Sequence, residues 1–270
     1  MDHTPGEYDM ITADGIQRAL DPVCCALHVE VFGEVTSTNT LMKERVSSGT
    51  AQPGTVIIAD HQTLGRGRSG KHFHSPSGTG LYMSILLDAV SLDTSLISSV
   101  TTMSAVAAAE AAETVSGREA RIKWVNDIYM DGKKVCGILA EAACSPGSPA
   151  PDRVVLGAGF NVCPPDGGFP EELKDIAGSI LPGPKDGVRN LLAADFLQRF
   201  YSIFTGRRSG YETEYRRRSL LTGREILVLS EDGSRRAFVL GLDEGLRLIV
   251  RYEDGEEARL NAGEVSLKLS

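Results

Sequence analysis

The distribution of apolar and polar residues along the chain predicts two regions of different character. Short apolar or alternating runs predict strands at residues 27–32, 55–59, 80–87, 120–130, 134–141 and 154–162. Apolar residues at helical spacing, and one polar run rich in Arg, predict helices at residues 12–20, 97–115, 190–206 and 211–221. The first 221 residues therefore have the pattern of an α+β domain.

Two local patterns refine this prediction. Asp131-Gly132, between two predicted strands, is typical of a two-residue hairpin turn. Residues 164–186 are rich in Pro and Gly, so we expect a surface loop with a short helix. In the helix at 190–206 the apolar stripe is expected to face the core, and consists of Leu191, Leu192, Phe196, Leu197, Phe200 and Phe204.

The pattern changes after residue 222. Five short alternating runs, at 225–229, 236–241, 246–252, 257–260 and 265–269, are separated by Asp/Glu/Gly turns. Such spacing is typical of a small β-barrel. We therefore predict an N-terminal extension over residues 1–26, a larger domain over 27–221 and a barrel domain over 222–270.

Composition narrows the class of protein. The chain has 270 residues, of which 41% are hydrophobic and 24% charged, as in ordinary globular proteins. Its net charge of −8 argues against nucleic acid as the main partner. The N-terminus lacks the basic and apolar regions of a signal peptide, and no apolar run is long enough for a membrane span. Five cysteines without a Cys-x-x-Cys pair favour reduced thiols in a cytoplasmic protein.

One stretch, the Gly/Arg loop at residues 60–76, carries the strongest functional pattern. Following the apolar run 55–59, it alternates Gly65, Gly67 and Gly70 with Arg66, Arg68 and Lys71. Glycines let the backbone approach a ligand, and guanidinium groups bind phosphate or carboxylate. The pattern is neither a Walker A loop nor a Rossmann fingerprint, and alone it also fits a solvated turn. As a nucleotide-phosphate loop it should be mobile when empty, because its cations repel one another.

Two further segments fit the same chemistry. Residues 36–39, Thr-Ser-Thr-Asn, precede a helical pattern and are typical of a helix cap, whose free N–H groups can bind an anion. Taken alone, this segment is better explained by simple capping. Lys123 stands beside Trp124, Asn126 and Asp127, and a partly buried lysine can stabilise charge during nucleotidyl transfer. A surface lysine is the alternative.

Five segments taken together, in this order along the chain, resemble the biotin protein ligases. They are residues 36–39, 62–71, 123–127, 134–141 and 157–162, and the resemblance extends over roughly residues 28–270. It implies an α+β fold with a mixed β-sheet, helices on one face and a C-terminal SH3-like β-barrel. The bifunctional members also have an N-terminal helix-turn-helix. The segment 11–20 resembles only the end of their linker, so we expect a monofunctional ligase.

The resemblance implies a two-step acyl transfer that uses biotin and ATP with Mg²⁺. Biotin would be activated to biotinyl-5′-AMP with release of pyrophosphate. Biotin would then pass to a specific lysine of a biotin carboxyl carrier domain. Catalysis would depend on positioning and charge stabilisation rather than on a protein nucleophile. Magnesium would be held mainly by phosphates, with no dedicated metal ligands in the protein.

The resemblance also implies roles for individual residues. Ser37, Thr38 and Asn39 would bind the ureido end of biotin, with Gln62 nearby, and Gly137, Gly157 and Gly159 would line a slot in which a Cβ atom would clash with the ligand. The expected catalytic residues are Lys123, Arg66 and Arg68, which with Gly67 also contact biotin. Nucleotide-binding residues would be Gly65, Arg66, Arg68, Phe73, Lys123, Asn126 and Asn161.

The sequence departs from the family pattern at four positions. Val125 replaces a proline in the segment that contains Lys123, and Phe73 stands where a tryptophan commonly stacks on adenine. Ser69 and Lys71 replace arginines of the loop. None of these changes removes a reacting group, although the smaller ring of Phe73 is expected to weaken ATP binding.

Three other functions fit parts of the pattern. A lipoate ligase or octanoyl transferase would share the fold but would lack the Gly-Arg-Gly-Arg sequence. A DNA-binding repressor is opposed by the missing helix-turn-helix and the negative net charge, so we expect no DNA binding. A binding module with a degenerate catalytic domain is opposed by the intact loop. A homodimer through the central sheet is compatible with the sequence, and we expect no membrane association.

Overall fold

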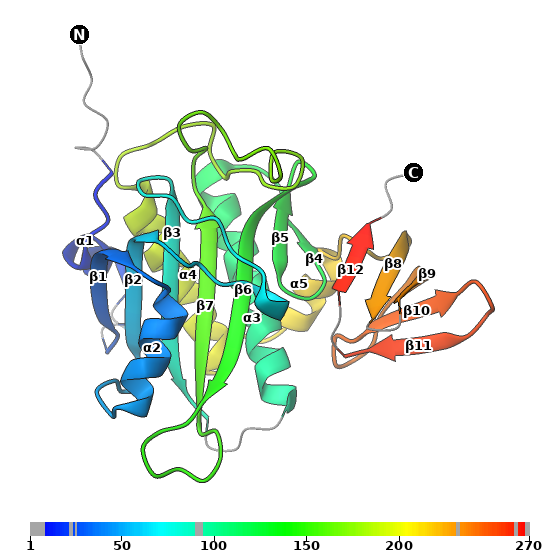
Figure 1. The fold of residues 1–270 in the computed structure, drawn as a ribbon, viewed down its shortest axis with the longest axis horizontal. Coiled ribbons are helices and arrows are strands. Elements are labelled where there is room, and N and C mark those ends of the chain that lie inside the picture. Colours follow the sequence, from blue (N-terminus) through cyan, green and yellow to red (C-terminus); the bar gives the residue numbers. More distant parts are fainter. Residues whose placement is uncertain are drawn as a thin grey trace.

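The computed structural model describes residues 9–21, 24, 26–89, 94–230, 233–261 and 264–267. Its larger part is a seven-stranded mixed sheet with the order β1-β2-β3-β7-β6-β5-β4 (Figure 1). The strands are β1 (His28–Val35), β2 (Thr55–Gln62), β3 (Gly80–Asp88), β4 (Arg121–Lys123), β5 (Asp127–Met130), β6 (Lys133–Ala143) and β7 (Arg153–Asn161). Strands β1 and β2 are parallel, and the remaining neighbours are antiparallel.

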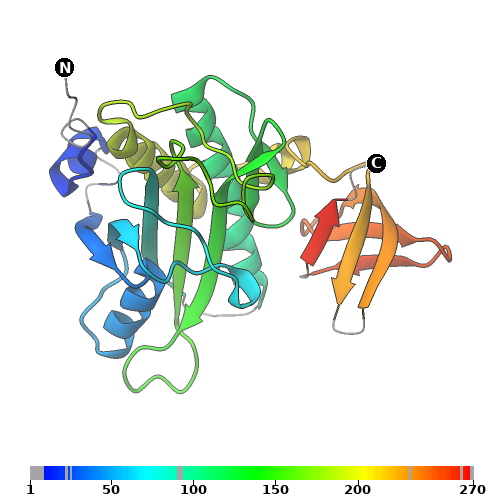
Figure 2. The same ribbon diagram turned by 45° about the horizontal axis from the view of Figure 1, so that its top comes forward.

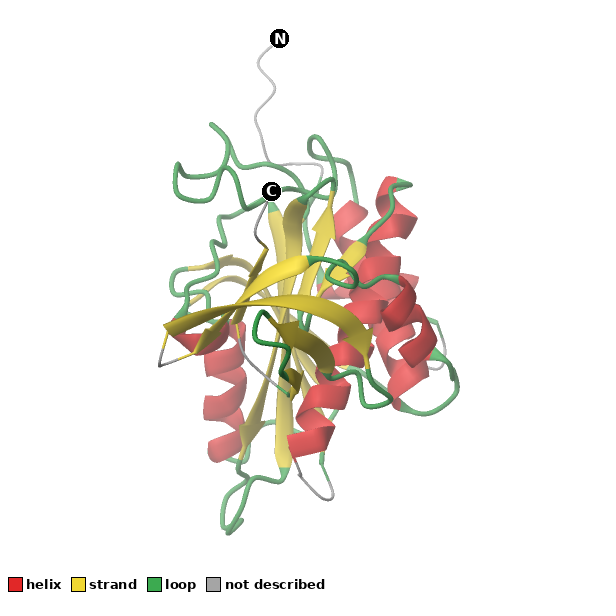
Figure 3. Ribbon diagram, turned by 90° about the vertical axis from the view of Figure 1, so that its right-hand side faces the viewer, coloured by secondary structure: helices red, strands yellow, loops and turns green. Residues whose placement is uncertain are grey.

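Five helices accompany this sheet: α1 (Ala13–Ala19), α2 (Thr38–Ser47), α3 (Thr94–Ser116), α4 (Val188–Phe204) and α5 (Tyr211–Arg217). Along β2, Val56 and Ile58 belong to the large core with α3 and α4, whereas Ile57 packs with Met42 and Val46 of α2. Successive side chains of a strand point to opposite faces of the sheet, so α2 lies on the opposite face from α3 and α4 (Figure 3).

The predicted fold class is confirmed, with one difference. We expected helices on one face, and α2 covers part of the other. This helix connects the parallel strands β1 and β2, and a parallel pair requires such a crossover connection. The functional consequence is that the N-terminus of α2 lies on a sheet face that the other helices leave uncovered.

The long helix α3 explains how one face of the sheet is covered closely. Its alanines, including Ala105, Ala108, Ala109 and Ala112, are fully buried. Small side chains allow close packing, and alanine has the highest helix propensity. On α4 the expected stripe is buried at Leu192, Phe196 and Phe200, but Leu191 was wrongly included because 56% of its surface is exposed. The core-facing side of α4 instead includes Ile203.

Two segments differ from their predicted secondary structure. Residues 120–130 do not form one strand, because the chain turns at residues 124–126 and β4 pairs back on β5, with Lys123 opposite Asp127. Residues 171–176 form consecutive turns rather than a short helix. Backbone hydrogen bonds from Lys134 to Ile176 and from Gly178 to Lys134, both 2.8 Å, hold this segment beside β6. The predicted Asp131-Gly132 hairpin is confirmed, with φ of 49° and 78°.

The C-terminal part forms the expected small antiparallel sheet, in the order β11-β10-β9-β8-β12. Its strands are β8 (Glu225–Ser230), β9 (Gly233–Leu242), β10 (Leu248–Tyr252), β11 (Glu257–Leu260) and β12 (Glu264–Leu267). The predicted turn at 231–233 lies partly outside the described residues. Figure 2 shows this sheet beside the β4–β5 end of the large sheet. The indole nitrogen of Trp124 donates to the Leu246 carbonyl at 2.9 Å and joins the two parts.

Candidate active site

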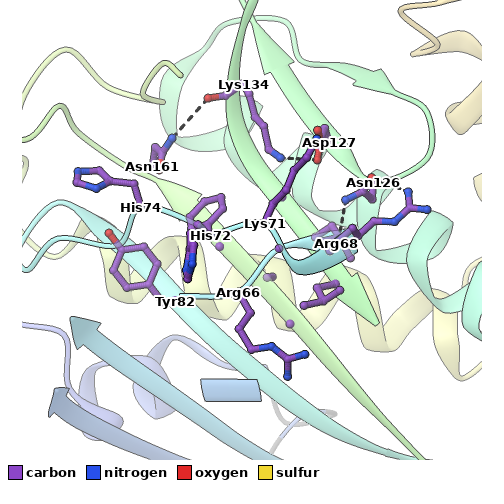
Figure 4. A pocket seen from close by; sticks show the side chains of 18 of the residues that line it. Arg66, Arg68, Lys71, His72, His74, Tyr82, Asn126, Asp127, Lys134 and Asn161 are labelled. Carbon is purple, nitrogen blue, oxygen red and sulfur yellow. Dashed lines mark hydrogen bonds and ion pairs between the residues drawn. The ribbon is translucent and has the colours of Figure 1, made fainter. Parts of the chain in front are cut away.

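A cavity of about 430 Å³ lies beside the N-terminus of α2, beneath the Gly/Arg loop. Residues from α2, the loop and strands β3 to β7 line it, and Figure 4 shows several of them. Fourteen of the fifteen predicted site residues line this cavity, namely Ser37, Thr38, Asn39, Gln62, Arg66, Gly67, Arg68, Phe73, Lys123, Asn126, Gly137, Gly157, Gly159 and Asn161. Gly65 is the exception. The structure thus brings together residues that are up to 124 positions apart in the sequence.

Buried polar groups form the wall at the end of α2. Ser37 caps the helix and accepts a hydrogen bond from the Thr40 amide. The backbone amide and the hydroxyl of Thr38 donate to the side-chain oxygen Oε1 of Gln62 at 2.9 and 3.2 Å. The hydroxyl of Ser84, on β3, donates to Asn39 Oδ1 at 2.5 Å. Because each of these groups has a partner, the wall is fixed before any ligand arrives.

Glu141, on β6, lies behind this wall and was missed by sequence reasoning as a site residue. Its carboxylate accepts from Asn39 Nδ2 at 3.0 Å and from Lys43 Nζ at 3.2 Å. Arg66 of the Gly/Arg loop approaches the same carboxylate at 3.1 Å. Burial raises the pKa of Glu141, but the Asn39 hydrogen bond and the charges of Lys43 and Arg66 outweigh it and hold this pKa below its usual range.

The three glycines on the sheet make room for protein side chains. A Cβ atom at Gly157 would lie 2.3 Å from Asn39 Oδ1, and one at Gly159 would lie 2.8 Å from the Phe73 ring. At Gly137 the nearest atoms belong to the end of the Lys134 side chain, at 3.2 Å. At Gly157 and Gly159, side chains of the protein itself, Asn39 and Phe73, already leave no room for a Cβ atom.

The Gly/Arg loop folds as a tight hairpin over the cavity. The Gly67 amide donates to the Lys71 carbonyl at 2.7 Å, and the backbones of Arg66 and His72 form an isolated antiparallel β-bridge. Gly65 lies outside the lining because it packs against the second half of the loop. A Cβ atom at Gly65 would be 2.3 Å from the Phe73 carbonyl oxygen. Arg66 extends toward Glu141, whereas Arg68 donates to Asn126 Oδ1 at 3.2 Å (Figure 4).

Two lysines flank Asp127 on the cavity wall. Lys134 Nζ lies 2.7 Å from Asp127 Oδ1 and 6.0 Å from the centre of the Phe73 ring (Figure 4). Lys123 Nζ lies 5.7 Å from the centre of the Tyr129 ring. Lys134 was not among the predicted site residues, although it begins the 134–141 segment on which the family resemblance partly rests. Its contacts place it at the cavity floor, between Asp127 and the glycine at 137.

Asn161 lies at the edge of the cavity, where its amide holds the segment that follows β7. Its Nδ2 donates to the carbonyl oxygens of Gly178 and Lys134, at 3.1 and 3.4 Å. The segment 164–180 adds three apolar side chains to the lining, Phe169, Leu173 and Ile176. The cavity therefore combines a polar wall at α2, an apolar surface near β6 and, above them, the basic Gly/Arg loop.

The charge of the lining suits an anionic ligand. Arg66, Arg68, Lys71, Lys123 and Lys134 contribute positive charge, and Asp127 is the one carboxylate among the described residues that line the cavity. Within the described ranges, no group of three or more His, Cys, Asp or Glu side chains could hold a metal ion. A metal bound here would therefore depend on ligand oxygens for most of its coordination.

Two other predictions concern the cysteines and the membrane. Cys24, Cys136, Cys144 and Cys163 are thiols outside any disulfide bond, and Cys25 lies outside the described residues. Burial raises the pKa of the Cys136 thiol well above its ordinary value, so this thiol is a packing residue. None of the helices in the described ranges combines the length and the apolar character needed to cross a bilayer.

The sheet face that carries α2 also carries the Gly/Arg loop and a cluster of cations, an arrangement typical of enzymes that bind and activate an anionic substrate. Residues 31–161 match the biotin/lipoate A/B protein ligase family. Over 210 residues the chain is 32% identical to the biotin–[acetyl-CoA-carboxylase] ligase of Mycobacterium tuberculosis, covering 74% of each chain. It is 29% identical over 233 residues to the bifunctional ligase/repressor of Bacillus spizizenii, covering 83% of this chain and 70% of that one.

Solved structures agree with these relatives. The biotin protein ligase of Aquifex aeolicus in complex with biotin and ATP superposes with a TM-score of 0.74 at 29% identity, over 90% of this chain and 99% of that one. The chain belongs to the biotin/lipoate A/B protein ligase family and is an enzyme of the biotin protein ligase type.

Proposed function

We propose that this chain activates biotin with ATP to biotinyl-5′-AMP and then transfers biotin to a lysine of a biotin carboxyl carrier domain. The observation that carries the proposal is the single cavity in which the polar end of α2, the Gly/Arg loop and Lys134 meet. The Aquifex relative, solved with biotin and ATP, supports the pair of substrates. The Mycobacterium relative, a biotin–[acetyl-CoA-carboxylase] ligase, supports the class of acceptor.

The polar wall suits the ureido end of biotin. A ureido group presents two N–H donors and a carbonyl acceptor, which require fixed partners of opposite kind. Ser37, Thr38 and Gln62 offer hydroxyl and amide groups on this wall. Asn39 directs its amide toward Glu141 and the Leu139 carbonyl, so we assign it to holding the wall.

The basic part of the cavity suits the reacting carboxylate and the phosphates. In the first step a carboxylate oxygen of biotin attacks the α-phosphorus of ATP, and the bond from that phosphorus to the bridging oxygen of pyrophosphate breaks. Negative charge accumulates on the α-phosphate, where fixed cations stabilise the transition state most. We assign this work to Lys134 and Arg68, with Arg66 toward the carboxylate of biotin and Lys123 further along the wall.

Lys134 is preferred to Lys123 because of its surroundings. Its ammonium group is beside the slot floor at Gly137 and is oriented by Asp127 at 2.7 Å. Lys123 lies against the ring of Tyr129, whose pKa burial and the charge of Asp127 raise to about 12.

In the second step the neutral amine of the carrier lysine attacks the acyl carbon of the adenylate. The bond from that carbon to the phosphate oxygen breaks, AMP leaves, and the amine gives up a proton to solvent. Phe73 and Asn126 are proposed to border the nucleotide, with Phe73 already resting on Gly159. Asn161 would act through the segment 164–180 that it holds.

Magnesium, when bound with ATP, would neutralise part of the charge of the phosphates. The lining fits this arrangement, because Asp127 is the one carboxylate on it within the described residues and is already paired with Lys134. We further propose that the enzyme works in the cytoplasm without binding DNA. A homodimer through the central sheet remains a prediction.

The first step can be tested alone, without a carrier protein. Purified enzyme with biotin and MgATP should release pyrophosphate and form biotinyl-5′-AMP, which mass spectrometry would detect, and lipoate or octanoate in place of biotin should give at least tenfold less product. Equal or better use of lipoate would redirect the proposal to the lipoate branch of the family.

A further inference from the structure

The carboxylate of Glu141 joins two walls of the cavity without lining it. Asn39, at the start of α2, and Arg66, in the Gly/Arg loop, both line the cavity, and Glu141 is bonded to both from behind. Lys43, one helical turn after Asn39, completes the set of donors at 3.2 Å. Two chain segments, α2 and the Gly/Arg loop, thus converge on the carboxylate of a third, β6.

The exposure of the two side chains indicates that Glu141 is the fixed partner and that it orients Arg66. The Glu141 side chain is 17% exposed, whereas that of Arg66 is 42% exposed. Glu141 is anchored on β6, which pairs with β5 on one side and β7 on the other, whereas Arg66 extends from the Gly/Arg loop. A long arginine side chain loses rotamer freedom when it binds a ligand, so a fixed carboxylate that already holds it lowers this cost.

We propose that Glu141 is a positioning residue that holds Arg66 in its ligand-binding orientation, and Asn39 in its place in the wall, at the biotin end of the cavity. The inference rests on the proposed biotin ligase function and extends it to a residue outside the cavity lining. Glu141 acts through charge-assisted hydrogen bonds and does not touch the substrate. Its removal should therefore weaken biotin binding more than ATP binding.

The test is a comparison of Glu141→Gln with wild type by calorimetric titration of biotin without ATP. Glutamine has nearly the same shape and can still accept from Asn39, but it removes the charge that attracts Arg66. The Kd for biotin should rise by about tenfold, the usual effect of one lost charge-assisted hydrogen bond. The KM for ATP in pyrophosphate release should change by less than about threefold.

Two variants separate positioning from a general loss of structure. Glu30→Gln breaks a comparable partly buried ion pair between β1 and the same helix α2, Glu30 with Arg45 at 2.6 Å, away from the cavity, and should leave the Kd within about twofold. Glu141→Asp keeps the charge and should recover part of the affinity. In an Arg66→Met background, Glu141→Gln should add less than about threefold, because the two residues act together.

Several outcomes would overturn the inference. A Kd within twofold of wild type for Glu141→Gln would exclude a positioning role, and tighter binding would mean that Glu141 withholds Arg66 from the ligand. Additive effects with Arg66→Met would show that Glu141 does not act through Arg66. Equal weakening of biotin and ATP, with a lower melting temperature, would indicate a structural role. Failure of wild type to bind biotin would instead reject the proposed function.

Discussion

At the scale of single residues, the clearest prediction concerns the two lysines beside Asp127. Lys134→Ala should lower the rate of biotin-dependent pyrophosphate release by about 100-fold, the usual cost of losing a group that stabilises transition-state charge. Lys123→Ala should lower it by less than about tenfold. A larger loss in Lys123→Ala than in Lys134→Ala would restore the role that sequence alone assigned to Lys123.

A second residue-scale prediction uses the glycines of the sheet. In Gly157→Ala the new Cβ would lie 2.3 Å from Asn39 Oδ1 and would displace it from Glu141, so biotin affinity should fall about tenfold. Gly33→Ala, also in a strand, has no atom within 4 Å of the new Cβ and should leave affinity unchanged. Biotin titration of both variants is the check, and equal affinities would show that Asn39 can move without cost.

Much of the site could be predicted from the sequence because its residues occur in short ordered segments. The segments 36–39 and 62–71 gave the cap and the loop, which are local features. Lys134 and Glu141 were missed because their importance depends on register. Asp127 pairs with Gly137 across β5 and β6, and this register places Lys134 beside Asp127 and Glu141 behind Asn39. No pattern within a single segment contains that information.

At the scale of elements, the β5–β6 hairpin turn can be tested directly. Gly132 has φ of 78°, a left-handed conformation that costs a residue with a Cβ atom about 1 kcal/mol. Gly132→Ala should therefore lower the free energy of unfolding by about 1 kcal/mol in urea, followed by Trp124 fluorescence. Gly245→Ala, outside that region of φ, should change it by less than half as much. Equal effects would mean that the turn conformation is not the cause.

Other elements show why sequence patterns fall short. The run 120–130 alternates like one strand, yet the chain reverses at 124–126 because Trp124 and Val125 are buried and Trp124 bonds to the small sheet. Similarly, α2 was expected on the same face as the other helices. A helix pattern identifies an apolar side but does not indicate which face of the sheet it will cover.

At the scale of the whole molecule, a buried arginine joins distant parts of the chain. Arg189 of α4 contacts Asp60 of β2 at 2.5 Å and Asp9 at 2.8 Å. Burial raises the pKa of Asp60, but its hydrogen bonds to Ser77 and Arg189 and the charge of Arg189 outweigh it and lower this pKa below 3.8. Asp60 therefore stabilises the fold at neutral pH, and this contribution is lost as the pH falls through its folded-state pKa.

Arg189→Met should lower the free energy of unfolding by about 3 kcal/mol near neutral pH, since it leaves partly buried carboxylates without a partner. The difference from wild type should shrink as the pH falls below about 4, where the carboxylates become neutral. Arg251→Met breaks an exposed pair with Glu257 and should change stability by less than about 0.5 kcal/mol. A difference independent of pH would show that Arg189 contributes through packing alone.

The measurement that tests the central claim most directly is biotin transfer to a purified biotin carboxyl carrier domain with MgATP, followed by intact mass. We predict one biotin on each carrier domain, dependent on ATP and absent when the acceptor lysine is replaced by arginine. The carrier should first be shown to accept biotin from another biotin protein ligase. The account would be contradicted if this carrier stayed unmodified in the presence of folded enzyme that binds both biotin and ATP.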